Sequence, residues 1–511
     1  MSIAANSTVI QFILYLWKSL VCLWKQSAVG AWCSRAGRAL KICAQNSSVC
    51  RTVAREGLIT RTWPECMLCR GIAVLGKIPC ALFRWLHAIA RNVWDGSAVF
   101  GALSSLGGAA WLPLGLVFTV MLCVPHERWD NLYGFLSVVA VTVLFLIGSM
   151  TRSSQRLQTE QLGPYMIFYI AFICYGLVAS FSIDLSMRFF VFHVTCFLIV
   201  LLMVSSIQTY QQLHWMTVLV GVGLAMAALY GCYQGHIGVE VVPSQQDMAV
   251  NVGMPGRVYS FFDNPNNFAE ILVMLVPLML ALLLNARTVR GRLGGVLVLA
   301  ASVIAIGHTY SRSGWIGLVG AVVLFFAFRN WRLIPVMIAA VAAVIPFLPE
   351  SIYNRILTIG NMNDTSTLYR LAIYEITGDL LRDYGWRGVG LGNDVMETVF
   401  HKYPAMYGSV YPIHTHNNYL QMWGEVGFFG LLAYLATVFG QLKAGVKAFV
   451  RSTDRRMKNM LSAAISAMCG ILVVSVAEYT WFYPRNMFLF WFLFGVIAVC
   501  VKMIRTQEDA K

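Results

Sequence analysis

The sequence predicts an all-α polytopic membrane protein of about twelve transmembrane helices, with one large external loop that contains short helices. Three observations support this fold class. Of 511 residues, 58% are apolar and only 12% are charged, which is unusual for a soluble globular domain. Apolar stretches of about 17 to 25 residues recur along the chain, and each is long enough to cross a bilayer as a helix. Positive charge also alternates between the predicted loops.

Residues 1–98 form a basic segment that differs from the rest of the chain. They contain twelve Lys and Arg against three acidic residues, so they supply +9 of the formal net charge of +15. Their apolar pieces are short, contain tryptophans and are interrupted by Lys18 and Lys25. This pattern favours helices lying on an anionic cytoplasmic leaflet over a nucleic-acid-binding segment. We therefore expect membrane lipids as partners and no nucleic acid.

Seven of the thirteen cysteines lie in this basic segment, and Cys66 and Cys69 form a C-x-x-C pair. A single pair of this kind is a weak zinc motif, and partly buried reduced thiols are the simpler interpretation. We expect neither a metal nor a cofactor.

Residues 99–503 form the predicted membrane domain, and residues 504–511 form a cytoplasmic tail. The predicted spans are 99–123, 132–151, 164–182, 189–209, 215–233, 266–285, 294–311, 313–329, 331–348, 417–441, 461–480 and 486–503.

The charge of the short loops predicts the orientation of these spans, because Lys and Arg favour the cytoplasmic side. With the N-terminus inside, every strongly basic loop is cytoplasmic, and the alternate loops are acidic or nearly uncharged. Both termini are then cytoplasmic, and residues 349–415 form the large external loop. The basic residues are Arg152, Arg156, Arg287, Arg290, Arg292, Arg329, Arg332, Lys443, Lys447, Arg451, Arg455, Arg456 and Lys458.

Titratable residues near the spans gather in the outer half of the predicted membrane. Such residues are costly in lipid and usually face a cavity or a partner. Taken singly, a glutamate such as Glu270 or Glu478 is more often an interhelical hydrogen-bonding group than a catalyst. We likewise interpret His193 and His308 as structural residues. Their common depth favours a site at the outer surface.

Two motifs at outer helix ends suit the recognition of phosphate. In FFDNPNNFAEILVMLVPL (261–278), Asn264 or Asn266 can cap a helix, and the free amides of a helix N-terminus attract anions. In HTYSRSGWIGL (308–318), Arg312 lies in a predicted outside turn, against the charge bias. It either extends to lipid headgroups or binds phosphate through its guanidinium group.

The external loop and its exit supply a third set of polar residues. Arg370 and Arg382 lie near the two ends of a predicted helix in this loop, and the following WRGVGLGND follows no strand, which argues against a nucleotide-binding loop. In HTHNNYLQMWGEVG, a histidine is suited to proton transfer. The H-x-H pair has no nearby His, Cys or Asp cluster to complete a metal site.

In their order, these motifs resemble the O-antigen ligase and polymerase superfamily over residues 230–500. The shared elements are N-P-N-x-x-A, then S-R before a membrane helix, then an arginine in a large external loop, then H-N-x-Y-L-x-x-x-x-E-x-G. Residues 1–98 lie outside this pattern.

The resemblance implies an inverting, metal-independent glycosyltransferase of cell-surface polysaccharide biosynthesis. Its donor would be a glycan linked to undecaprenyl diphosphate, and its acceptor a hydroxyl of a glycan, a lipid or the cell wall, at the outer face of the bacterial cytoplasmic membrane. By motif, His416, Arg312 and Arg370 are the expected catalytic residues. Expected substrate-binding residues are Asn266, Asn417, Glu425 and Arg382. His414 has no secure counterpart, and we expect water to reach it.

Ligase and polymerase activities remain alternatives, because they share this chemistry and differ in the acceptor. A lipid-linked glycan flippase or another multi-pass transporter is the main alternative to an enzyme. Such a protein is expected to show internal repeats and charged residues along the whole crossing path, and neither is found in the sequence. A membrane scaffold does not account for polar residues gathered at one depth.

Overall fold

The structure is a computed structural model that describes residues 57–242, 254–360, 365–404 and 410–509, with scattered positions between 15 and 55. Every regular element in this part of the chain is an α-helix or a 3-10 helix, which confirms the all-α class. Most of the basic segment before residue 57 lies outside the described residues.

Eleven helical segments of the described chain are long and apolar enough to cross a membrane, or twelve when one bent pair is counted as a span. The prediction of about twelve transmembrane helices is confirmed in this sense. The longer helices are α6 (Met67–Ile89), α8 (Ala98–Gly108), α9 (Trp111–Cys123), α10 (Asn131–Thr151), α11 (Gly163–Val178), α12 (Ile183–Ser206), α13 (Tyr210–Ile237), α14 (Pro265–Asn285), α15 (Val289–His308), α16 (Arg312–Asn330), α17 (Ile334–Val344), α19 (Thr365–Tyr384), α21 (Asn418–Arg451), α22 (Arg455–Val474) and α23 (Pro484–Asp509), and the shorter ones are α5 (Leu58–Thr62), α7 (Arg91–Asp95), α18 (Glu350–Leu357) and α20 (Asn393–Phe400).

Two predicted spans differ from the observed helices. The stretch 99–123 is divided into α8 and α9, which are bent by 79° from each other. Gly107 of α8 packs against the backbone of α10 so closely that a Cβ atom there would overlap the Leu144 carbonyl. The stretch 331–348 holds α17, which has 11 residues and is therefore about 16 Å long, shorter than a bilayer core. Pro335 and Pro346 occupy the first turns of α17 and of the 3-10 helix that follows it.

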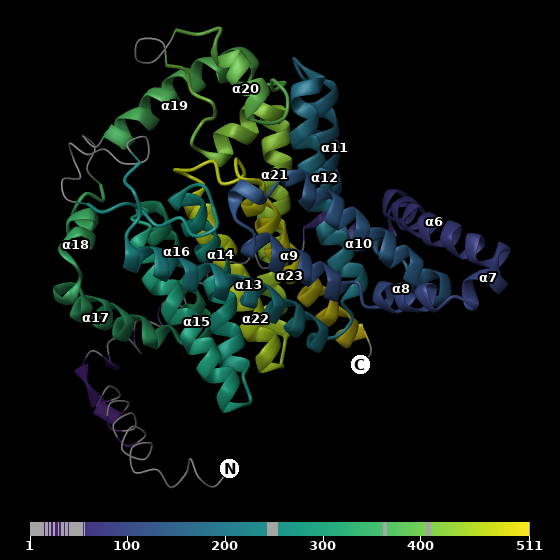
Figure 1. The fold of residues 1–511 in the computed structure, drawn as a ribbon, viewed down its shortest axis with the longest axis horizontal. Helices are drawn as coiled ribbons and strands as arrows, with labels where there is room; N and C mark the ends of the chain where they lie inside the picture. The colour runs from purple at the N-terminus through teal and green to yellow at the C-terminus, as the bar shows by residue number, and fades with distance from the viewer. Residues whose placement is uncertain are drawn as a thin grey trace.

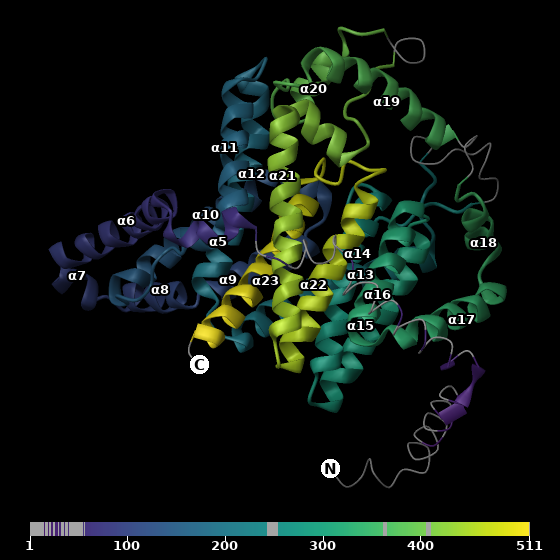
Figure 2. The same ribbon diagram turned by 180° about the vertical axis from the view of Figure 1, so that it is seen from behind.

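The α6 helix belongs to the segment predicted to rest on the membrane surface, yet it is long and apolar enough to be a span. It contacts the chain that follows α10: the Thr159 hydroxyl donates to the Ile72 carbonyl at 2.7 Å, and Arg84 donates to the Gln155 carbonyl at 3.3 Å. Together α6, α7 and α8 extend from one side of the bundle, and α17 and α18 lie on the opposite side (Figures 1 and 2).

The centre of the bundle is α23, whose apolar stretch is completely buried, and it packs against α12, α21 and α22. Fully buried aromatic side chains such as Trp481 and Trp491 fill this core. The α14 and α16 helices pack on α22, while α19 and α20 lie over the end of the bundle near the start of α21 (Figure 1). This packing holds the ends of these helices next to one another, although the helices are far apart in the sequence.

A break in α21 organises the same end of the molecule. Gly427 has non-helical backbone angles (φ 75°, ψ 177°), so the helical hydrogen bonding is interrupted there. The glycine-rich loop after α19 fills the gap: the N–H groups of Val389 and Gly390 donate to the carbonyls of Gly424 and Glu425, and Phe428 N–H donates to Gly385. The glycines of this loop therefore allow close backbone packing against α21.

Candidate functional site at the polar end of the bundle

Three non-glycine residues of the described chain have a positive φ, and each comes shortly before one of the motif helices. Ser260 (φ 56°) precedes α14, Tyr310 (φ 51°) precedes α16, and His416 (φ 48°) precedes α21. Residues in this left-handed region cost free energy, and they persist when the surrounding structure holds them. Tyr310 and His416 lie within motifs predicted from the sequence, and Ser260 directly precedes the first of these motifs.

Glu478, in the loop between α22 and α23, joins these motifs. Its Oε1 accepts hydrogen bonds from Arg370 Nη2 at 2.5 Å and from Asn266 Nδ2 at 3.3 Å. Its Oε2 lies 3.4 Å from Nδ1 of His416. Three of the predicted site residues therefore converge on a carboxylate that the sequence alone favoured as structural.

The charge of this carboxylate is set by its partners. Burial by itself raises the pKa of Glu478, but the positive charge of Arg370 and the hydrogen bond from His416 outweigh burial and lower the pKa to about 2. Glu478 is therefore ionised at neutral pH. Arg370 is held on a second side by the Ser366 hydroxyl at 2.8 Å, and its Nε is buried without a hydrogen-bond partner among the described residues.

Asn266 connects this carboxylate to Arg257, a residue that the motifs did not include. The Asn266 Oδ1 atom accepts from Arg257 Nη2 at 2.6 Å, and Arg257 Nε donates to the Thr309 carbonyl at 2.8 Å. The helix cap is supplied by Asn264, whose side chain accepts from the Asn266 N–H at 2.8 Å. Of the two asparagines that the sequence offered as caps, Asn264 caps α14 and Asn266 faces the site.

Arginine side chains from several segments add positive charge around Arg257. Burial, the nearby charge of Arg355, and the charges of Arg312 and Arg370 lower the pKa of Arg257 to about 9, against an opposing effect of Glu478. Arg257 remains charged at neutral pH. Arg312 donates to the Thr358 carbonyl at 3.0 Å, and Arg355 donates to the Tyr310 carbonyl at 3.3 Å. These contacts tie the start of α16 to α18 and the turn after it.

His414 is buried, which contradicts the expectation that water reaches it. Its side chain is packed against Tyr479 and Phe482, and the whole residue is only 8% exposed. Burial and the neighbouring His416 lower the pKa of His414 to about 3, so it is neutral at physiological pH. Its Nδ1 accepts the backbone N–H of His416 at 3.2 Å. His414 therefore supports the strained backbone of His416.

Asn417 and Tyr374 hold the same turn from other directions. The Asn417 side chain caps α21 by accepting from the N–H groups of Tyr419 and Leu420, and its Nδ2 donates to the Val476 carbonyl at 2.9 Å. The Tyr374 hydroxyl donates to the His416 carbonyl at 3.3 Å and lies 3.2 Å from the Val476 carbonyl. Asn417 is thus placed to shape the site as a helix cap.

The two remaining predicted residues lie away from Glu478. Glu425 is completely buried at the break in α21, where Gln421 donates to it at 2.8 Å and the Tyr479 hydroxyl at 3.2 Å. Arg382 forms an ion pair with Asp379 at 2.8 Å on α19, and its side chain is 78% exposed. The structure therefore places Glu425 inside the bundle, at the break in α21, and Arg382 on the surface.

In the Cys66/Cys69 pair, as in the His414/His416 pair, the backbone N–H of the second residue donates to the side chain of the first. Cys66 caps α6 by accepting from the Cys69 N–H at 3.2 Å. Within the described residues, no three His, Cys, Asp or Glu side chains form a group that could hold a metal ion.

Arg257 and Arg355 are not among the site residues predicted above, although their positions in the sequence are unusual. Both arginines lie within segments predicted to be external, where the charge bias disfavours arginine, as it does for Arg312. Glu478 had no comparable signal, because its significance depends on three residues that are distant in the sequence.

The fold and this basic, histidine-containing site define a multi-pass helical membrane protein with a polar site at one end of its bundle. Residues 296–435 match the protein family described as O-antigen ligase. This confirms the resemblance to the O-antigen ligase-like superfamily, and the family suggests an enzyme that acts on lipid-linked glycans in polysaccharide biosynthesis. The matched segment contains Arg312, Arg370 and His416, whereas Asn266 and Glu478 lie outside it. A comparison with curated proteins finds no match for the chain.

Proposed function

We propose that this protein transfers a glycan from undecaprenyl diphosphate to an acceptor hydroxyl at the outer face of the bacterial cytoplasmic membrane. The observation that carries the proposal is the convergence of His416, Arg370 and Asn266 on the buried carboxylate of Glu478, beside further arginines. A proton acceptor next to a cluster of guanidinium groups suits the transfer of a group away from a diphosphate.

The arginines would bind the diphosphate of the donor. A guanidinium group can donate two parallel hydrogen bonds to phosphate oxygens, and it keeps its charge when partly buried. Arg312, Arg370 and Arg257 come from three different segments, and the charges of Arg312 and Arg370 act on Arg257, which is bonded to Asn266 at the start of α14. Their positive charge would be most stabilising as negative charge develops on the departing diphosphate, and each such contact is worth about 10²- to 10³-fold in rate.

His416 would remove the proton of the acceptor hydroxyl. Because Glu478 is ionised, it favours the tautomer of His416 that carries its proton on Nδ1. The lone pair of Nε2 is then the proton acceptor, and the His416 side chain keeps 26% of its surface exposed. Glu478 would also stabilise the imidazolium that forms, as the carboxylate does in a catalytic triad.

The proposed reaction is a single displacement at the anomeric carbon of the donor. The acceptor oxygen attacks the anomeric carbon from the face opposite the diphosphate, and its proton passes to His416. A new glycosidic C–O bond forms as the bond from the anomeric carbon to the phosphate oxygen breaks. The electron pair of that bond remains on the released undecaprenyl diphosphate. This displacement inverts the anomeric configuration and needs no metal.

An assay with purified components tests this proposal against the flippase alternative. The full chain is reconstituted in vesicles with an undecaprenyl-diphosphate-linked glycan and a candidate acceptor carrying free hydroxyl groups. Glycan transfer is expected to release undecaprenyl diphosphate in amounts equal to the glycosylated acceptor, with an inverted anomeric linkage by NMR. Movement of intact donor across the vesicle membrane without cleavage would instead establish the flippase.

A further inference from the structure

A cavity of about 660 Å³ lies between α13, α14 and α15, at the end of these helices away from the candidate site. It is lined by the first halves of α13 and α15 and by the last two turns of α14, including Tyr210, Asn285 and Thr288. The candidate site uses the other ends of two of these elements, at Asn266 and Thr309. Since α14 has 21 residues, the two places are separated by about 30 Å along the helix.

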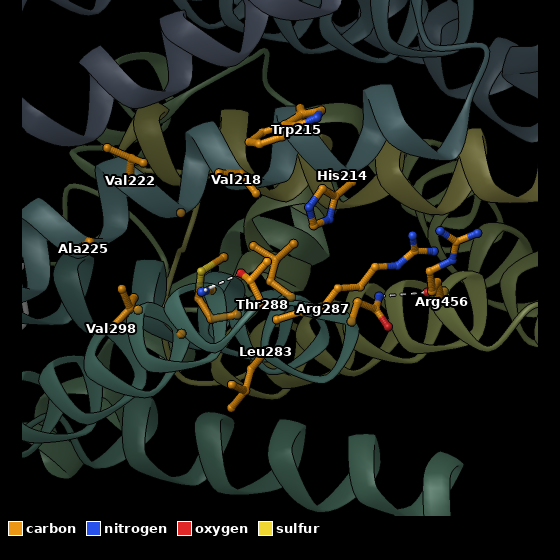
Figure 3. Close-up of a pocket in the computed structure, with 18 of the residues that line it drawn as sticks. His214, Trp215, Val218, Val222, Ala225, Leu283, Arg287, Thr288, Val298 and Arg456 are labelled. Atoms are coloured by element: carbon orange, nitrogen blue, oxygen red, sulfur yellow. Dashed lines mark hydrogen bonds between the residues drawn. The ribbon is translucent and has the colours of Figure 1, made fainter. Parts of the chain in front are cut away.

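The lining of the cavity is polar at one end and apolar at the other. Figure 3 shows His214, Arg287 and Arg456 at one end, and Val222, Ala225 and Val298 at the other. A lining that is polar at one end and apolar at the other suits a molecule with a charged head and an apolar chain.

The polar end is built by a set of hydrogen bonds. The Asn285 side chain donates to the Tyr210 hydroxyl at 2.8 Å and to the Arg456 carbonyl at 3.2 Å, while Asn459 donates to Asn285 at 2.6 Å. The guanidinium of Arg456 lies over the Tyr210 ring, 5.1 Å from its centre, and also lies 3.6 Å from the Asp454 carboxylate. Arg456 is therefore held at the cavity by its ring contact with Tyr210.

His214 adds an unused polar atom to this end. Its Nδ1 is buried and has no hydrogen-bond partner among the described residues. The His214 ring stacks on Tyr210, with ring centres 6.2 Å apart, and so lies beside the same arginine. A buried polar atom without a partner costs free energy unless a ligand or water satisfies it.

The apolar end opens to the surface of the bundle. Val222, at this end, is 49% exposed, and Trp215, next to His214 at the polar end, is 50% exposed. They belong to α13, which is long and apolar enough to span the membrane, so this opening faces the acyl chains of a bilayer. A lipid can therefore enter the cavity from the side.

We propose that this cavity binds an anionic glycerophospholipid, with its phosphate on Arg287 and Arg456 and an acyl chain along Val222, Ala225 and Val298. Basic residues next to a membrane helix attract anionic headgroups, and basic pockets between transmembrane helices bind such lipids. The bound headgroup lies at the membrane surface opposite the candidate site, so this lipid is not the glycan donor in its reactive position. The bound lipid stabilises the packing of α13, α14 and α15, whose other ends lie at the candidate functional site.

Lipid-dependent stability of the purified full chain tests this site. Apparent melting temperatures in detergent are measured with added dioleoylphosphatidylglycerol, dioleoylphosphatidylcholine or inorganic phosphate. The anionic lipid should stabilise the protein in a saturable manner, and the other two should not. The Arg287→Gln/Arg456→Gln double variant should need on the order of tenfold more anionic lipid for the same effect.

Two matched controls distinguish lipid binding in the cavity from a general effect of positive charge on the protein. Arg290→Gln/Arg332→Gln removes the same charge from exposed positions that do not line the cavity, one in the first turn of α15 and one in the 3-10 helix after α16, and it should leave the lipid response unchanged. Gly294→Leu fills the cavity from a position with open space around its Cβ, and it should abolish the response, whereas Gly320→Leu on α16 should not.

Three results would overturn the proposal. They are an equal response to both lipids, a response to inorganic phosphate as large as that to the anionic lipid, and an unchanged response in Arg287→Gln/Arg456→Gln or Gly294→Leu.

Discussion

Glu478 accepts hydrogen bonds from Arg370 and Asn266 and lies next to His416, so one carboxylate orients side chains from three segments. Glu478 as a whole is 7% exposed. A buried carboxylate is stable only when it is paired, and removing one partner of such a pair is strongly destabilising. The acid is therefore expected to be a positioning residue for both the proposed base and a proposed phosphate ligand.

The Glu478→Gln variant should show this role in the pH dependence of stability. The folded pKa of about 2 lies below the ordinary value of 4.5, so the stabilisation from ionised Glu478 is complete above about pH 5 and is lost as the pH falls toward 2. Glu478→Gln should lower the apparent melting temperature at pH 7, and the difference from wild type should shrink between pH 5 and pH 3.

Glu375→Gln, at an exposed position of α19, is the control and should change the melting temperature little at any pH. A difference for Glu478→Gln that stayed constant down to pH 3 would contradict the assigned pairing.

His414 should act through the backbone of His416. Because its Nδ1 accepts the His416 N–H, His414→Ala should lower kcat by about tenfold or more while leaving KM nearly unchanged. His414→Asn should recover much of this loss, since an amide oxygen can accept the same N–H. Steady-state kinetics of the two variants measure the effect. Equal kcat values for the alanine and asparagine variants would exclude this positioning role.

At the scale of the element, the helix boundaries of the site follow from local chemistry. Asn264, Ser311 and Asn417 each cap the helix that begins after them, as short polar side chains at these positions predict. Hydropathy likewise predicts most spans, because each span is a continuous apolar stretch of the sequence. It does not predict the bend between α8 and α9 or the break at Gly427, since these depend on backbone contacts with distant segments.

Gly427→Ala should destabilise the protein through this break. A Cβ at Gly427 would lie 2.4 Å from the Trp386 carbonyl, and its φ of 75° is unfavourable for alanine. The expected loss is at least about 1–3 kcal/mol, visible as a lower apparent melting temperature or reduced yield of inserted protein. Gly320→Ala, where the Cβ meets open space in α16, should be neutral or stabilising. Similar behaviour of the two variants would show that the break tolerates a side chain.

At the scale of the whole molecule, the site forms where α14, α16 and α21 begin and where α22 and α23 are joined. The motifs containing Asn266, Arg370 and His416 were predicted from the sequence, and the structure brings these residues together. Glu478 could not be selected in the same way, and the place of Arg257 in a predicted external segment did not show that it meets Asn266, because hydropathy gives the spans but not which helix ends meet. Arg382 was chosen for its place near a helix end, and the structure places it on the surface.

The proposed orientation places this end of the molecule outside the cell. Thr398→Cys, at an exposed position of α20, should react with a membrane-impermeant thiol reagent in intact cells, in a background whose reactive native cysteines are replaced. Arg290→Cys, in a loop predicted to be cytoplasmic, should react only after permeabilisation. The opposite pattern would place the site in the cytoplasm and would exclude a donor presented at the outer face.

If His416 accepts the proton of the acceptor hydroxyl, the turnover of His416→Ala with purified undecaprenyl-diphosphate-linked donor must fall. We predict a loss of about 10²- to 10⁴-fold in kcat, with insertion and donor binding retained, because no other proton acceptor is expected at that position. His401→Ala, at an exposed histidine of the same predicted external segment, should retain full activity. Near-normal turnover of His416→Ala would contradict the general-base role and the mechanism built on it.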